Sequence, residues 1–172
     1  DRDPAAHWAL GRALWLNREH ETSLTELQRC VDLSPNFALG YYTLGFVQSQ
    51  AGDTRAAILA LETARQLSPF DPLLFGILAS RAVAHLRLGE LQEAALWSAR
   101  AAVRPNAHDH VLVIAAHCAV LAERRDQARE LLARLRARAP GYGMGDLLRA
   151  FRFDPDTEQL LRRAARQIGF GE

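Results

Sequence analysis

The sequence contains no lysine, since all 21 of its basic residues are arginine. Its formal net charge at pH 7 is only +1, so no bulk field attracts nucleic acid or an anionic membrane. We interpret the missing lysine as a coding bias of a GC-rich genome, although arginine also suits two-point contacts with carboxylates. The chain does not begin with methionine, and Asp1-Arg2-Asp3-Pro4 resembles a junction out of a preceding segment, so we expect a fragment.

Long hydrophobic runs are also missing. The longest uncharged apolar stretch, residues 111–122, has 12 residues and is too short to cross a bilayer. No basic segment followed by a hydrophobic one opens the chain, so nothing indicates secretion. The two cysteines, Cys30 and Cys118, are far apart, which excludes a closely spaced disulfide framework. We therefore expect a cytoplasmic protein with two buried free thiols and no membrane partner.

What the sequence does contain is a repeated pattern of small and apolar residues. Leu10-Gly11 recurs as Leu44-Gly45, displaced by 34 residues. The same displacement relates Ser23 to Ala57, Leu27 to Leu61, Cys30 to Ala64 and Pro35 to Pro69. A period of this length is typical of arrays of helix-turn-helix units. Within each unit the apolar residues recur every three to four positions, which predicts two helices with one apolar stripe each.

These landmarks also predict how each helix pair packs and where it ends. Gly11 and Gly45 lie on the apolar stripe, so a neighbouring helix can approach closely there. Gly52 marks a turn, and Asp53 is placed to cap the helix that follows. The prolines at positions 35 and 69 close one unit and open the next.

The pattern resembles the tetratricopeptide repeat, which shares the leucine-glycine pair, the downstream alanine and the closing proline. The resemblance implies an all-α, right-handed superhelix in one domain, residues 1–172. About four repeats are expected at residues 4–35, 36–69, 70–105 and 106–140, with C-terminal capping helices in residues 141–172. The third repeat departs from the register, because Gly52 and Gly89 are 37 residues apart. We expect its first helix to be lengthened.

The end of the chain carries a second resemblance. Phe151-Arg152-Phe153-Asp154-Pro155, followed by residues 158–164 and a closing Gly169, looks like the end of certain bacterial signalling proteins. Those proteins join a class III adenylate cyclase-like catalytic domain, or a winged-helix DNA-binding domain, to a tetratricopeptide array. The resemblance implies a regulatory part of a larger protein. Neither the metal-binding aspartates of the cyclase nor the winged helix lies in these residues, so we assign neither activity.

First helices line the concave side of such arrays, and ligands of the family usually lie along that groove. We place six candidate binding residues there: Trp8, Arg12, Trp15, Tyr42, Phe46 and Ser49. The rings would hold apolar side chains of a protein or peptide ligand, while Arg12 pairs with a carboxylate. Alternatively, the rings pack between helices or enclose a small apolar metabolite. A further alternative is structural, in which the terminal repeats self-associate and form a homodimer.

Other clusters of polar residues do not indicate a metal site, a catalytic site or a nucleic-acid site. The His-Asp-His stretch at residues 108–110, with His117 and Cys118, has no spacing typical of a metal site. No nucleophile elbow, catalytic base or phosphate-binding glycine loop is recognisable. We therefore expect no enzyme, no cofactor and no metal. The arginine-rich residues 124–138 lack interleaved aromatic residues, so we expect a solvated helix face rather than direct nucleic-acid binding.

Overall fold

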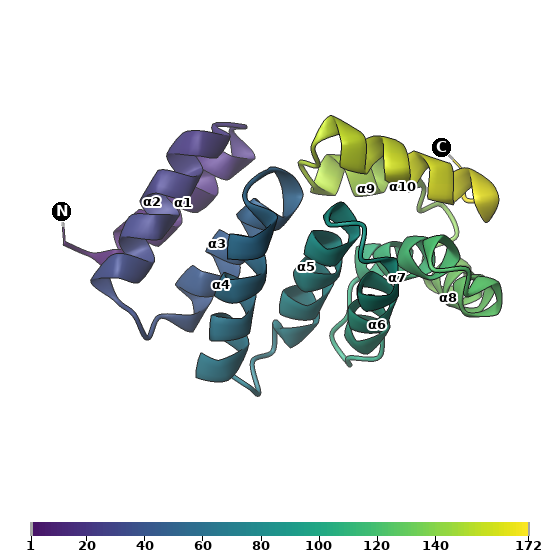
Figure 1. Cartoon of the computed structure of the whole chain (residues 1–172), viewed down its shortest axis with the longest axis horizontal. Coiled ribbons are helices and arrows are strands. Elements are labelled where there is room, and N and C mark those ends of the chain that lie inside the picture. Colours follow the sequence, from purple (N-terminus) through teal and green to yellow (C-terminus); the bar gives the residue numbers. More distant parts are fainter. Residues whose placement is uncertain (1, 172) are drawn as a thin grey trace.

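The computed structural model describes residues 2–171, which form ten α-helices and no strand. Asp1, in the predicted junction, and Glu172, in the predicted cap, lie outside the described residues. The helices are α1 (Pro4–Leu16), α2 (His20–Leu33), α3 (Ala38–Ala51), α4 (Thr54–Leu67), α5 (Leu74–Arg87), α6 (Leu91–Ala102), α7 (Asp109–Leu121), α8 (Arg125–Arg138), α9 (Met144–Ala150) and α10 (Pro155–Gln167). The helices from α1 to α8 pack as four consecutive pairs. Figure 1 shows these pairs in a row, with α9 and α10 lying across the C-terminal half. The predicted all-α superhelix of helix pairs with C-terminal helices is confirmed.

Aspartate side chains cap the N-termini of three of these helices. Asp3, Asp53 and Asp154 accept hydrogen bonds from backbone N–H groups in the first turns of α1, α4 and α10. These N–H groups have no partner within their own helix, so a capping oxygen stabilises the helix end. The cap predicted at Asp53 is confirmed.

The third helix pair differs from the expectation, because its first helix is not lengthened. α5 has 14 residues, the same number as α3. The additional length lies in the connections, chiefly in residues 68–73 between α4 and α5, which we call the α4–α5 loop. This loop contains Pro69 and Pro72, and proline does not continue a helix because it lacks the backbone donor. The extra residues therefore form a loop.

The helices of the first two pairs approach closely at the predicted glycines. A Cβ atom placed on Gly45 would lie 2.6 Å from Leu61 Cγ, and one placed on Gly11 would lie 2.6 Å from Leu27 Cγ. Both leucines are completely buried. The repeated glycine and leucine positions in the sequence therefore reflect the same helix contact made twice.

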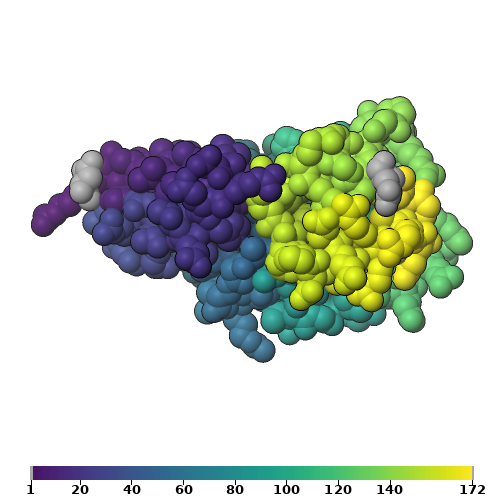
Figure 2. Space-filling model, turned by 90° about the horizontal axis from the view of Figure 1, so that it is seen from above, coloured from purple at the N-terminus to yellow at the C-terminus, as the bar shows by residue number. Residues whose placement is uncertain are grey.

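The two C-terminal helices complete the core of that half of the molecule. Met144, Leu147, Leu161 and Phe170 are buried in the same hydrophobic cluster as residues of α5 to α8. Arg163 and Arg166 on α10 are exposed, which gives this end a polar outer side. Figure 2 shows residues of α9 and α10 covering one side of the molecule beside the N-terminal helices. None of the helices in residues 2–171 is long and apolar enough to span a membrane.

Both thiols lie in the interior. Cys30 and Cys118 are buried free cysteines, as the sequence predicts. Burial raises the pKa of the Cys118 thiol to about 12. Because the thiolate is the reactive form, neither its position nor its pKa suits a nucleophile.

His117 on α7 makes the stability of the fold depend on pH. Its side chain is completely buried, and burial lowers its pKa from 6.5 to about 4, although a hydrogen bond to the backbone O of Val113 opposes the shift. The pKa of His117 is lower in the folded chain than in the unfolded chain, so the unfolded chain takes up a proton first as the pH falls. The folded state therefore keeps its full stability above about pH 6.5 and loses part of it as the pH falls toward 4. We expect His117 to lower the free energy of unfolding by about 2 kcal/mol between pH 7 and pH 5.

Urea unfolding at a series of pH values measures this dependence. The His117→Leu variant should show a shallower slope between pH 7 and pH 5, because it cannot take up the proton. Burial also lowers the pKa of His20 and of His110, so part of the slope should remain. An unchanged slope in the variant would show that another group carries the pH dependence.

Candidate functional site

The first helices of the four pairs, α1, α3, α5 and α7, lie next to one another and form one face of the array (Figure 1). We call it the first-helix face. A cavity of about 180 Å³ lies on it between α1 and α3. Its lining residues are Arg12, Trp15, Tyr42, Thr43, Phe46 and Val47. This α1–α3 cavity is large enough for a benzene-sized group, since cavities of about 150 Å³ bind benzene in other proteins.

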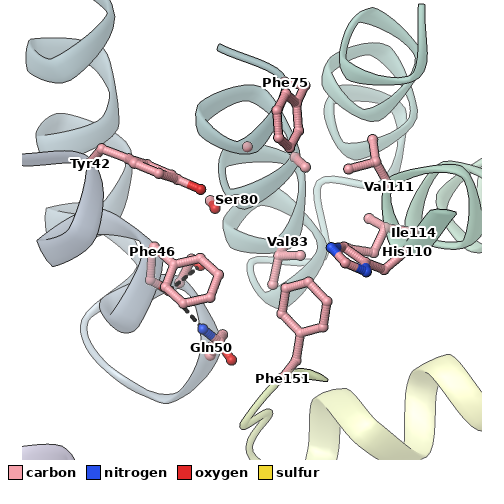
Figure 3. Close-up of a pocket in the computed structure, with 13 residues that line it drawn as sticks. Tyr42, Phe46, Gln50, Phe75, Ser80, Val83, His110, Val111, Ile114 and Phe151 are labelled. Carbon is pink, nitrogen blue, oxygen red and sulfur yellow. Dashed lines mark hydrogen bonds between the residues drawn. The ribbon is translucent and has the colours of Figure 1, made fainter. Parts of the chain in front are cut away.

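A smaller cavity, of about 60 Å³, lies between α3, α5 and α7. Phe151, which follows α9, points toward it from the far end of the chain (Figure 3). The other lining residues include Phe46, Phe75, Val83, His110 and Ile114. An aromatic ring from the C-terminal region thus forms part of the lining of a cavity between three first helices.

Residues 151–154, which we call the inserted segment, contact this face through aromatic rings. The ring centroid of Phe151 lies 6.0 Å from that of Phe46 and 5.4 Å from that of His110. Phe151 also stacks on Phe153, with 5.2 Å between centroids. Such ring pairs contribute about 0.5–1.5 kcal/mol each beyond the area that they bury. Phe46 lines both cavities, so it connects the inserted segment to the α1–α3 cavity.

Polar contacts hold the inserted segment against α3 and α5. The backbone N–H of Asp154 donates to the backbone O of Gln50 over 3.0 Å, and the N–H of Arg152 donates to the Gln50 side-chain oxygen. Arg87 Nε lies 2.7 Å from the Asp154 carboxylate. The same guanidinium donates to backbone carbonyl groups at the end of α3. Gln50 and Arg87 therefore join α3, α5 and the start of α10.

Four of the six candidate residues line the α1–α3 cavity together: Arg12, Trp15, Tyr42 and Phe46. The other two lie elsewhere. Trp8 packs edge-on against Phe37 and donates its indole N–H to Thr43 Oγ1 over 2.8 Å. Ser49 lines the smaller cavity, and its hydroxyl donates to the backbone O of Phe46 on its own helix. Trp8 and Ser49 therefore make packing contacts within the array.

The surroundings of the α1–α3 cavity are cationic. Among the described residues that line either cavity, none is an aspartate or glutamate. The guanidinium of Arg12 lies 5.6 Å from the centroid of Trp8, and that of Arg152 lies 5.6 Å from the centroid of Trp15. Within residues 2–171, Arg152 Nε and Trp15 Nε1 are buried donors without a hydrogen-bond partner. Because unpaired buried donors destabilise a protein, this region favours a ligand with acceptor oxygens.

Tyr42 contributes a protonated phenol to this face. Burial raises the pKa of Tyr42 to about 12, although the nearby Arg12 lowers it. A Cβ atom on Gly76 would overlap the Tyr42 hydroxyl, so the glycine on α5 makes room for the ring. Because its pKa is raised, the Tyr42 hydroxyl keeps its proton at neutral pH and remains a hydrogen-bond donor.

The cluster at residues 108–110 serves packing. His108 stacks on His110 with 5.3 Å between centroids and contacts Phe75 edge-on at 4.9 Å. Asp109 pairs with Arg138 over 3.1 Å. Burial lowers the pKa of His110, which favours the neutral ring that faces Phe151. No group of three or more His, Cys, Asp or Glu side chains in residues 2–171 is arranged to hold a metal ion.

The sequence pattern does not mark Gln50, Arg87 or His110 as functional residues, and it marks Phe151 and Asp154 only through a resemblance. Their contacts join distant parts of the chain, since Arg152 and Gln50 are 102 positions apart. The feature of the sequence that could have indicated this site is the pair of aromatic residues within residues 151–153, in an otherwise charged stretch. That signal does not name the helices that the segment contacts.

A comparison with protein-family models finds no match for this chain, and a comparison with curated proteins finds none either. The fold and the cavities define the class of protein. It is a helical-repeat array whose first-helix face carries two cavities lined by aromatic residues. The smaller cavity borders the inserted segment, and the larger one borders Arg12.

Proposed function

We propose that this chain is a non-catalytic protein- or peptide-interaction module that binds its ligand on the first-helix face. The observation that carries the proposal is that this face already holds a non-helical stretch of polypeptide, residues 151–154. Ring contacts, main-chain hydrogen bonds and an ion pair hold that stretch, and peptide-binding grooves use the same kinds of contact. The neighbouring α1–α3 cavity offers space for an apolar side chain, with Arg12 available for a carboxylate.

We further propose that the array is of the tetratricopeptide class and regulates a larger bacterial signalling protein. The 34-residue repetition and the matching glycine–leucine contacts of the first two pairs support the class. The link to a cyclase-like protein or a transcriptional regulator rests on the resemblance of the stretch that begins at Phe151. In that role, a ligand on the first-helix face would control an attached output domain.

Charge reversal at Arg12 tests the interaction proposal. The probes are peptides selected from a random phage-displayed library on the full chain. We expect them to combine acidic with apolar residues and to bind the Arg12→Glu variant about tenfold more weakly, because attraction becomes repulsion. Fluorescence anisotropy measures the dissociation constants.

The matched control is Arg163→Glu, because Arg163 is exposed on α10 and lines neither cavity. It should change the affinity by less than about twofold, since an isolated exposed charge contributes little. A library that yields no binder, or equal affinity for the Arg12→Glu variant and the wild type, would refute binding at the α1–α3 cavity.

A second candidate function is self-association through α1, the end helix of the array. Leu10 and Leu16 on α1 are 48% and 57% exposed, and the end helix of an array has no further repeat to cover such side chains. Two copies would then meet at this end and bring two output domains together. Light scattering after size exclusion tests this: a mass of 19.1 kDa at every concentration excludes it, and a dimer that dissociates on dilution supports it.

A further inference from the structure

A second surface lies on the opposite side of α5, near the α4–α5 loop. Gly76, Ser80 and Val83 of α5 line a cavity of the first-helix face. Leu74 and Leu78 lie on the other side of the helix, because each residue advances about 100° around the axis. They belong to a cleft of about 600 Å³ that α4, α5 and α6 share. Figure 1 shows the α4–α5 loop at the end of its helices that points away from α9 and α10.

Phe70 stands at the edge of this cleft, in the α4–α5 loop. Its side chain is almost fully solvated, because the residue is 95% exposed. Pro69 and Pro72 lie on either side of it in the sequence and restrict the backbone of the loop. An exposed aromatic ring beside an apolar cleft is typical of an interaction surface, since aromatic residues dominate binding energies.

Arginines surround the cleft. Its lining includes Arg65, Arg100 and Arg104. Glu62 pairs with Arg65, and the hydrogen bond from Arg65 lowers the pKa of Glu62 to about 2. The Glu62 carboxylate therefore stays ionised and paired with Arg65. Arg100 and Arg104 form no ion pair with any described residue. The cleft therefore has a positive surplus.

Trp97 holds one of these cations in position. The guanidinium carbons of Arg81 and Arg100 lie 3.8 Å and 4.7 Å from the Trp97 ring centroid. The same guanidinium of Arg81 also pairs with the Glu62 carboxylate over 2.6 Å. A guanidinium stacked on tryptophan loses little freedom on binding and keeps N–H donors for a carboxylate. Arg100 is thus oriented for an anion.

We propose that this cleft binds an acidic segment of a partner protein that also carries an apolar side chain. The apolar side chain lies over Leu74, Leu78 and Trp97 and against Phe70, and the acidic side chains pair with Arg100 and Arg104. A cleft receives a protruding side chain, whereas a lipid headgroup surface supplies none, so the shape favours a protein over a membrane. The proposal does not depend on ligand binding at the first-helix face.

The test uses the ¹⁵N-labelled full chain and a short capped peptide with two glutamates on each side of a central leucine–phenylalanine pair. We expect chemical-shift changes in residues 65–78 and 97–104, and the affinity is read from these residues, because the α1–α3 cavity is itself expected to accept acidic and apolar groups. The Arg100→Glu/Arg104→Glu double variant should bind the peptide about tenfold more weakly, and Phe70→Ser about fivefold more weakly. Phe70 is solvated, so its substitution should leave thermal unfolding unchanged.

Matched controls separate this cleft from general charge and apolarity effects. Arg55→Glu/Arg163→Glu makes the same change of charge at exposed sites outside the cleft, and Leu59→Ser removes an apolar side chain that is 70% exposed. Neither should change the affinity by more than about twofold. Three results would overturn the proposal: no peptide binding, shifts confined to the first-helix face, or unchanged binding by the double variant. Phe70-dependent sedimentation with phosphatidylglycerol vesicles, without peptide binding, would assign the surface to a membrane.

Discussion

Replacing Arg87 with methionine is expected to lower the free energy of unfolding by about 3 kcal/mol, because it leaves a half-buried carboxylate without its cation. The Arg87 side chain is 15% exposed and lies 2.7 Å from Asp154. Its guanidinium also hydrogen-bonds to backbone carbonyl groups that end α3. Methionine keeps most of the apolar length of the side chain, so the loss reports the polar contacts. Urea unfolding followed by circular dichroism measures it.

A double-mutant cycle locates that loss at the inserted segment. Asp154→Asn keeps a capping side chain for α10 but removes the charge that faces Arg87. We expect the two substitutions together to cost at least about 1 kcal/mol less than the sum of the single losses. The amide of Asp154 should also exchange hydrogen faster in Arg87→Met. Arg129→Met is the control, because its ion pair with Asp126 is exposed, and a loss as large as that of Arg87→Met would refute the assignment.

The second large effect is expected at the helix contact of the second pair. Leu61→Ala should lower the free energy of unfolding by about 4 kcal/mol, because it leaves a cavity where a completely buried leucine stood. Gly45→Ala alone should cost about 1 kcal/mol, since its methyl group collides with Leu61 while its helix propensity improves. In the Leu61→Ala background the same change should cost at least about 1 kcal/mol less, because the methyl group no longer meets the leucine and only the contact with the Ala57 backbone O, at 3.1 Å, remains.

The difference between the cost of Gly45→Ala in the two backgrounds is the critical observation, and urea unfolding of the four chains measures it. Gly11 and Leu27 have the same geometry, with 2.6 Å between the added Cβ and Leu27 Cγ, so they should behave alike. Gly141→Ala is the neutral control, because a Cβ there meets no atom within 4 Å. If Gly45→Ala costs the same in both backgrounds, the two positions do not interact as the structure indicates.

The inserted segment limits where a ligand can bind on the first-helix face. It is anchored at both ends, because Leu147 of α9 and Leu161 of α10 are buried in the core. Releasing residues 151–154 would expose these anchors or strain the short connection between them. We therefore expect the segment to stay in place on ligand binding and the ligand to use the α1–α3 half of the face.

Several local features follow from the sequence because their causes are local. The apolar periodicity of each helix, the cap at Asp53 and the glycine contacts with Leu27 and Leu61 depend on residues within one helix pair. The repetition at 34 residues makes the periodicity and the glycine contact visible twice. The expected lengthening of the first helix of the third pair is wrong, because spacing alone does not distinguish a longer helix from a longer loop. The prolines at positions 69 and 72 favour the loop.

The candidate site was only partly predictable. Helix periodicity places Arg12, Trp15, Tyr42 and Phe46 on one face, and the structure brings them to one cavity. The same periodicity does not distinguish them from Trp8 and Ser49, whose polar atoms bond to Thr43 and to the α3 backbone. Those bonds depend on how each helix is rotated about its axis relative to its neighbour. The apolar stripe of a helix is several residues wide, so the sequence does not specify that rotation closely.

The sequence by itself thus determined the class of fold, the pairing of neighbouring helices and the face on which aromatic residues gather. Only the tertiary structure decided that Phe151 enters that face, that Gln50 and Arg87 hold the inserted segment, and that Arg100 stacks on Trp97 beside a solvated Phe70. The physical reason is that contacts within and between neighbouring helices recur in each repeat, so they produce a periodic pattern in the sequence. Contacts between residues about a hundred positions apart occur once, and they depend on how all the intervening helices pack.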